Sequence, residues 1–206
     1  MCNKDLDTKH VILQAAEEEF LDKGFGNAKM MAIAKRAGMS HSMLHYHFQS
    51  KENLFQMIFQ QKIQTLSQMF EGISEKNLPF TETIQLFVEC QFDFIAQNPR
   101  LPLFVINEII SDRKNLNLVI EIVRPKIIEI FNKFQKMLDD EIEKGAVRPI
   151  QFIHLIMNAL SMNLSTFLAL PILGELIPDF DETTKESLLN ERRESNVQFI
   201  LKALQP

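Results

Sequence analysis

The residues with the most suggestive chemistry lie between Ser40 and Lys51, where the sequence reads SHSMLHYHFQSK. Imidazole and hydroxyl groups exchange hydrogen bonds with the edges of nucleic-acid bases, and an ammonium group binds phosphate. No acidic residue occurs from position 23 to position 51, although the whole chain has a formal net charge of −5. A cationic segment with such side chains in an acidic chain indicates a localised site for nucleic acid. Its cations are Lys23, Lys29, Lys35, Arg36 and Lys51.

Other chemistry has weaker support from the sequence. His41 and His45 are four residues apart, so one helix would place both on the same face, but no cysteine or carboxylate lies close by in the sequence to complete a metal site. We therefore expect no metal and no cofactor. The chain holds no P-loop, dinucleotide-binding or metalloprotease motif, and Cys90 would need a histidine such as His154 to be brought to it by folding. We expect that the protein is not an enzyme.

The first element expected to position the cationic segment is a helix at about residues 8–23, where apolar residues recur at helical spacing. Gly24 stands where a left-handed residue would end this helix. With that ending, Phe25 can pack back on Phe20.

Two short helices are predicted next, at about residues 29–37 and 41–47. A helix-turn-helix needs a small residue where its helices meet, and Ala34 supplies it. It also needs a residue that tolerates positive φ in the turn, and Gly38 supplies that. Ser40 can cap the second short helix. The spacing of these residues predicts a helix-turn-helix.

The same stretch contains four spaced elements: Gly24-Phe25, Ile33-Ala34-Lys35-Arg36-Ala37-Gly38-Met39-Ser40, Leu44-His45-Tyr46-His47-Phe48 and Ser50-Lys51-Glu52-Asn53-Leu54. With these elements the stretch resembles the DNA-binding segment of the TetR family of transcriptional regulators. It departs from the common pattern at Ala28 and Lys29, where hydroxyl residues are usual, and at Ser42 and His45, where Gly and Tyr are frequent.

The resemblance implies a recognition helix that enters the major groove of an operator duplex. His41, Ser42 and Met43 are expected to face the bases, because a methionine can contact a thymine methyl group and the other two can hydrogen-bond to base edges. The residues expected to contact phosphates, as the resemblance implies, are Ser40, His45, Tyr46 and Lys51, and Lys29 and Lys35 can add to them.

The rest of the chain predicts an all-α fold, because it has only 6 glycines and long stretches rich in Leu, Ile, Phe, Glu and Lys. The helices expected beyond the short pair lie at about residues 51–74, 81–97, 101–111, 116–144, 150–170 and 182–204, and Pro125 is expected to kink or split the one that contains it. A three-helix helix-turn-helix domain at residues 1–52 is expected to precede a larger helical domain for effector binding and dimerisation at residues 53–206.

The segment from residue 149 to residue 174 carries no charged side chain. Its length could span a bilayer, but its polar residues would be costly against lipid, so we expect a helix buried between protein surfaces and no membrane contact. The resemblance implies a homodimer in which the helices at about 150–170 and 182–204 of each copy form a four-helix bundle. A cytoplasmic protein is the simplest interpretation.

The resemblance also implies that the larger domain binds a small-molecule effector. Phenylalanine and methionine would suit an apolar effector, although at helical spacing they are more often plain core. The expected function is a repressor that a small apolar effector releases from a palindromic operator; the alternative is a helical, dimeric protein-interaction module without operator binding. The candidate pocket residues are Phe87, Cys90, Gln91, Phe94, Phe104, Asn107, Glu108, Met157 and Asn158.

Overall fold

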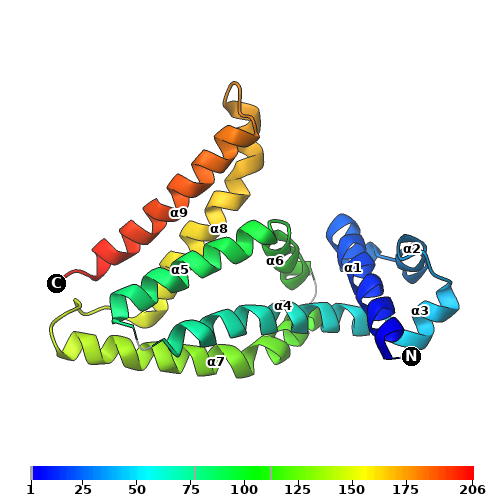
Figure 1. Cartoon of the computed structure of the whole chain (residues 1–206), viewed down its shortest axis with the longest axis horizontal. Coiled ribbons are helices and arrows are strands. Elements are labelled where there is room, and N and C mark those ends of the chain that lie inside the picture. Colours follow the sequence, from blue (N-terminus) through cyan, green and yellow to red (C-terminus); the bar gives the residue numbers. More distant parts are fainter. Residues whose placement is uncertain (1, 77, 112) are drawn as a thin grey trace. The chain divides into compact units, whose positions relative to one another are not determined.

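A computed structural model describes residues 2–76, 78–111 and 113–206. Over these residues the regular structure is α-helix with no strand, which confirms the all-α fold (Figure 1). The helices are α1 (Cys2–Asn27), α2 (Met30–Arg36), α3 (His41–Phe48), α4 (Lys51–Ser74), α5 (Phe80–Gln97), α6 (Leu101–Ser111), α7 (Arg113–Glu143), α8 (Phe152–Leu176) and α9 (Glu182–Leu204).

The helices form two compact units that do not follow the sequence linearly. The N-terminal unit comprises Met1–Thr65 and Leu103–Pro125, and the C-terminal unit comprises Leu66–Pro102 and Lys126–Pro206. Helices α4, α6 and α7 therefore contribute residues to both units. The domain boundary between residues 52 and 53, which the change in charge suggests, stays a prediction.

Prolines inside two helices do not end them. Helix α7 continues through Pro125 without being split, and α8 continues through Pro171 to Leu176 instead of ending near residue 170. A proline removes only its own N–H donor, so the neighbouring residues can keep the helical hydrogen-bond pattern.

The N-terminal unit is organised around the end of α1. Gly24 has φ of 74° and ψ of 158°, so the helix is interrupted there, as its glycine predicts. The Phe25 ring then packs on Phe20 with 5.6 Å between ring centroids, which confirms the expected contact. Helix α1 packs on α2, and α2 packs on α3.

The core of the C-terminal unit is rich in phenylalanine. Helix α5 packs on α8 and α9, which also pack on each other. The Phe87 ring of α5 stacks on Phe70 at 4.5 Å and contacts Phe134 at 5.3 Å between centroids. Val197, Ile200 and Leu204 of α9 complete this core. Burial of these apolar faces stabilises the packing of the helices.

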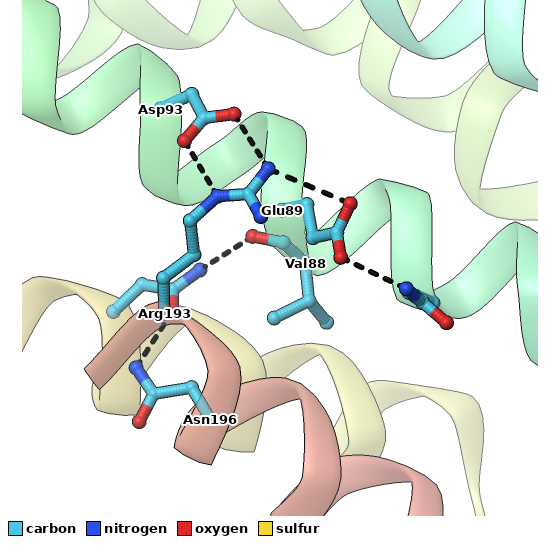
Figure 2. A network of polar contacts seen from close by, with 7 residues as sticks. Val88, Glu89, Asp93, Arg193 and Asn196 are labelled. Carbon is cyan, nitrogen blue, oxygen red and sulfur yellow. Dashed lines mark hydrogen bonds and ion pairs between the residues drawn. The ribbon is translucent and has the colours of Figure 1, made fainter. Parts of the chain in front are cut away.

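A polar network crosses the buried contact of α5, α8 and α9 (Figure 2). The fully buried Asn163 amide donates hydrogen bonds to the Val88 carbonyl at 3.0 Å and to Gln91 Oε1 at 2.9 Å. Its oxygen accepts one from Asn196 Nδ2 at 2.9 Å. At the edge of the same contact, the Arg193 guanidinium of α9 binds the Asp93 carboxylate of α5 with two hydrogen bonds, of 2.8 and 2.9 Å.

Helix α8 also carries apolar side chains outside the face that packs in this core. By length and composition it could cross a membrane, and it is the one such helix in the described part of the chain; 28% of its most apolar window is buried. The large apolar side chains that α8 leaves exposed are Ile153, Met157, Leu160, Leu168, Ile172 and Leu176.

We predict that Asn163→Ala lowers the free energy of unfolding by about 3 kcal/mol, because it leaves Gln91, Asn196 and the Val88 carbonyl without this hydrogen-bond partner. Urea unfolding followed by circular dichroism measures the change. The control is Ser165→Ala, an exposed residue on the same helix, which should change stability by less than about 0.5 kcal/mol. Equal losses for the two variants would contradict the structural role of the network.

Candidate nucleic-acid interface

The helix-turn-helix forms as its residues predict. Gly38 has φ of 67°, and the chain turns back so that the Met39 N–H donates to the Ala34 carbonyl at 2.9 Å. The Ser40 hydroxyl caps α3 by accepting a hydrogen bond from the Met43 N–H at 3.2 Å. The turn and the cap together fix where α3 begins.

One face of α3 is anchored, and the other is exposed. Leu44 and Phe48 are 0% and 2% exposed, so they hold the helix against the rest of the unit. The expected DNA-contacting residues of this segment are all exposed, and Tyr46 is 84% exposed. The exposed set is Ser40, His41, Ser42, Met43, His45 and Tyr46. Within it the His41 and His45 rings meet edge to face at 4.9 Å.

Of the cations, Lys23, Lys29 and Lys35 are exposed. Arg36 is exposed as well, but its guanidinium contacts carboxylates of α1, Glu18 at 3.2 Å, Glu19 at 3.1 Å and Asp22 at 2.8 Å. The hydrogen bonds to Asp22 and Glu18 raise the pKa of the Arg36 guanidinium. Arg36 therefore joins α2 to α1.

Lys51 is also used within the protein. Its ammonium group donates hydrogen bonds to the carbonyls of Phe25 at 2.6 Å, Gly26 at 3.1 Å and Ala28 at 3.2 Å. The same nitrogen lies 4.6 Å from the centroid of the Phe25 ring. An ammonium group has three donors. The phosphate contact expected of Lys51 stays a prediction, and it would have to replace one of these hydrogen bonds.

The nine candidate pocket residues are divided between the two units. Phe104, Asn107 and Glu108 belong to the N-terminal unit, and the C-terminal unit holds Phe87, Cys90, Gln91, Phe94, Met157 and Asn158. Several already have structural contacts, since Phe87 is part of the core, Gln91 binds Asn163 and Glu108 binds the Phe25 N–H. Met157 and Asn158 are exposed. A shared pocket for these residues stays a prediction.

The C-terminal unit forms a pocket of about 330 Å³ from other residues, at the end of α4 and along α7. Its walls combine apolar side chains with carboxylates and one ammonium group. The lining residues are Phe70, Glu71, Glu75, Glu129, Ile130, Lys133 and Phe134.

Cys90 has surroundings that oppose nucleophilic chemistry. Burial raises the pKa of the Cys90 thiol, and the nearby carboxylates of Asp93 and Glu89 raise it further. A cysteine acts as a nucleophile in its thiolate form, which this environment disfavours.

The sequence interpretation missed the internal uses of Arg36, Lys51 and Glu108. The sequence did indicate partners for Arg36, because Glu18, Glu19 and Asp22 lie close together on the first helix and attract a nearby cation. The hydrogen bonds that join Lys51 and Glu108 to backbone atoms reach at least 23 residues away in the sequence, and such contacts leave no pattern in the residue types.

Known proteins resemble this chain in sequence. The sequence model described as "Bacterial regulatory proteins, tetR family" matches residues 12–58, which cover α2, α3 and parts of α1 and α4. The Fatty acid metabolism regulator protein of Bacillus subtilis is 27% identical over 135 residues, 65% of this chain and 66% of that protein. The HTH-type transcriptional regulator UidR of Escherichia coli is 28% identical over 144 residues, 69% of this chain and 70% of that protein.

Solved structures agree with this fold along almost the whole chain. The transcriptional regulator FadR from Bacillus subtilis, in complex with stearoyl-CoA, superimposes with a TM-score of 0.71 at 16% identity, covering 96% of this chain and all of that one. FadR from Bacillus halodurans gives a TM-score of 0.70 at 16% identity over 96% of this chain. The helical fold and its exposed recognition helix define a helix-turn-helix transcriptional regulator. The DNA-binding segment of the chain, residues 12–58, is that of the tetR family.

We predict that Lys51→Met destabilises the N-terminal unit by about 2 kcal/mol, because three carbonyls lose a charged donor. Amide hydrogen exchange across residues 20–60 measures this locally. Lys35→Met is the matched control, since Lys35 is exposed and should change stability by less than about 0.5 kcal/mol. If Lys51→Met leaves the exchange rates unchanged, the hydrogen bonds of Lys51 do not stabilise the unit.

Proposed function

We propose that this regulator is a repressor that binds a palindromic operator as a homodimer and is released from it by a small apolar effector. The observation that carries the proposal is the exposed face of α3, where hydrogen-bonding and apolar side chains project from a helix whose opposite face is buried. A short helix exposed in this way fits the major groove, and two copies match the two halves of a palindrome.

The exposed face divides by chemistry into base readers and phosphate binders. His41, Ser42 and Met43 occupy the first turn of α3, the part of a recognition helix that reaches base edges. Ser40, His45 and Tyr46 would contact phosphates on either side, and the exposed ammonium groups of Lys29 and Lys35 would add to them.

Dimerisation through α8 and α9 is supported by the apolar side chains that α8 leaves exposed. They follow one another at helical spacing and are as much as 70% exposed at Leu176, and Phe199 of α9 is 61% exposed. Burial of such an exposed apolar surface against a second copy would lower the free energy of the protein in water. The opposite face of α8 carries the buried polar residues Asn163 and Thr166, so a pairing of two soluble copies suits this helix better than lipid on all sides. We therefore propose a cytoplasmic protein.

The apolar part of the effector is best sought in a long acyl chain, such as that of an acyl thioester. A relative at 27% identity is a fatty acid metabolism regulator, and a structure of the same fold binds stearoyl-CoA. The C-terminal unit of this chain is built on phenylalanine and aliphatic side chains, which favour an apolar chain over a polar ligand.

We predict that the purified protein selects a palindromic duplex from random DNA. Stearoyl-CoA, but not free coenzyme A, should release the protein from this duplex. Lys35→Gln should lower the slope of log affinity against log salt by about one, because one phosphate contact is lost. Lys136→Gln, an exposed lysine of α7, should leave the slope unchanged. If the wild-type protein retains no duplex even at low salt, the operator proposal is wrong and a protein-interaction module becomes the better interpretation.

We predict that the protein is a dimer and that Leu168→Glu converts it into single copies of 23.9 kDa, since each new carboxylate would lie in an apolar interface. Analytical ultracentrifugation distinguishes the two states. Asn190→Glu is the control, because this exposed residue lies nine positions before Phe199, on the opposite side of α9. A dimer that survives Leu168→Glu would place the interface elsewhere.

A further inference from the structure

Two methionines of the helix-turn-helix expose their thioethers to water. Met31 on α2 is 73% exposed, and Met43 in the first turn of α3 is 47% exposed. A thioether that is open to solvent can be oxidised, which turns a flexible apolar side chain into a polar one. The two methionines differ in their place, because the first turn of α3 is the part proposed above to reach base edges.

The backbone that carries the Met43 side chain is fixed. Its N–H donates a hydrogen bond to the Ser40 hydroxyl at 3.2 Å, and the next residue, Leu44, is buried. The Met43 side chain therefore projects from a helical turn that is capped at its start and anchored beside it. Because nearly half of this side chain is already in water, the folded protein can accept a polar group there without having to bury it.

Met43 is the apolar member of the three residues proposed to read bases. His41 and Ser42 carry hydrogen-bonding groups, whereas Met43 ends in a thioether and a methyl group. An apolar side chain recognises thymine through the methyl group of that base. A sulfoxide at this position would place a strong hydrogen-bond acceptor against an apolar group, where water is excluded and no donor replaces it.

Cys90, by contrast, is a poor target for a peroxide. Its side chain is half-buried, and burial together with the carboxylates of Asp93 and Glu89 raises the pKa of its thiol. A peroxide reacts with the thiolate form of a cysteine, which these surroundings disfavour. Exposed thioethers are therefore better targets than this thiol.

We propose that Met43 is a modification site, at which oxidation by a peroxide to methionine sulfoxide lowers the affinity of the regulator for its operator. The proposal rests on the operator binding proposed above and names a way in which that binding is regulated. The modification acts on protein that is not bound to DNA, because in the proposed complex the duplex covers the first turn of α3.

The chemistry needs a peroxide and no other reagent. The sulfur lone pair attacks one oxygen of hydrogen peroxide, and the O–O bond breaks. The second oxygen leaves as hydroxide and takes up the proton of the first, so that sulfoxide and water are the products. Sulfur is oxidised by two electrons, and the peroxide is reduced by two. A methionine sulfoxide reductase restores the thioether, which makes the change reversible.

The first test measures operator affinity before and after treatment with hydrogen peroxide. Dithiothreitol is added after the treatment, because a thiol reduces disulfides and sulfenic acid but leaves methionine sulfoxide in place. Oxidation should weaken binding to the selected duplex by at least about tenfold, since each half-site would bury an unpaired polar group. Affinity for an unrelated duplex and its dependence on salt should not change, because no charge is altered. Methionine sulfoxide reductase should restore the original affinity.

Two leucine variants assign the effect to one residue. Met43→Leu keeps an apolar side chain that peroxide does not oxidise, so treatment should change its operator affinity by less than about twofold, whatever its starting value. Met31→Leu is the matched control, because it removes the more exposed thioether of α2 and should remain as sensitive as the wild-type protein. The urea midpoint of unfolding should be the same before and after treatment, because the sulfoxide of Met43 lies in water.

Mass spectrometry locates the sulfoxides and measures how fast they form. In the free protein the peptide that contains Met43 should gain one oxygen atom. With the selected duplex bound, Met43 should be oxidised at least about fivefold more slowly, while the exposed Met57 of α4 keeps its rate. An equal rate for Met43 with and without the duplex would contradict its place at the bases.

The outcomes separate this proposal from the proposed function. If the untreated protein binds no duplex, operator binding fails, and the regulation inferred here fails with it. If the untreated protein binds and the treated protein binds the selected duplex equally well although Met43 carries the sulfoxide, this proposal alone is wrong. An equal loss of affinity in Met43→Leu would overturn it as well, and it would assign the effect to another methionine.

Discussion

The exposed surface of α3 depends on the burial of the opposite face of this eight-residue helix. A helix as short as α3 is not stable by itself in water, because helix nucleation costs more than so few hydrogen bonds return. It persists because Leu44 and Phe48 are buried and because Ser40 caps its first turn. The remaining side chains of α3 are consequently free to face outward, and the other helices of the unit serve to hold this one in place.

Local pairing of charges, rather than the net charge of the chain, determines where the protein surface is positive. An acidic chain can present a cationic surface because its carboxylates and some of its cations neutralise one another elsewhere. The α1 carboxylates bind Arg36, and Glu17 of the same helix binds Lys62 of α4 at 2.9 Å. Among the described cations at positions 23–51, Arg36 and Lys51 bind groups of the protein itself, and Lys23, Lys29 and Lys35 are exposed.

The sequence was most informative where local rules decide the structure. Helices α4, α6 and α9 have the predicted bounds, because caps, glycines and apolar spacing act over a few residues. The tight turn at Gly38 and the contact of Phe25 with Phe20 follow from the same rules. The hydrogen bond of Glu108 could not be predicted for the opposite reason, since it spans 83 residues and involves a backbone atom of no particular type, the Phe25 N–H. The end of α8 was placed too early, and the helix continues through Pro171 because the residues around this proline still favour a helix.

The bare apolar side of α8 has a consequence for how the protein behaves in the cell. In the dimer proposed above this surface is covered only in the pair, so association would stabilise the folded chain. The fraction of folded protein would then rise with the concentration of the chain. A regulator made in few copies would be only partly associated, and the synthesis rate of the chain would itself determine how much active regulator exists.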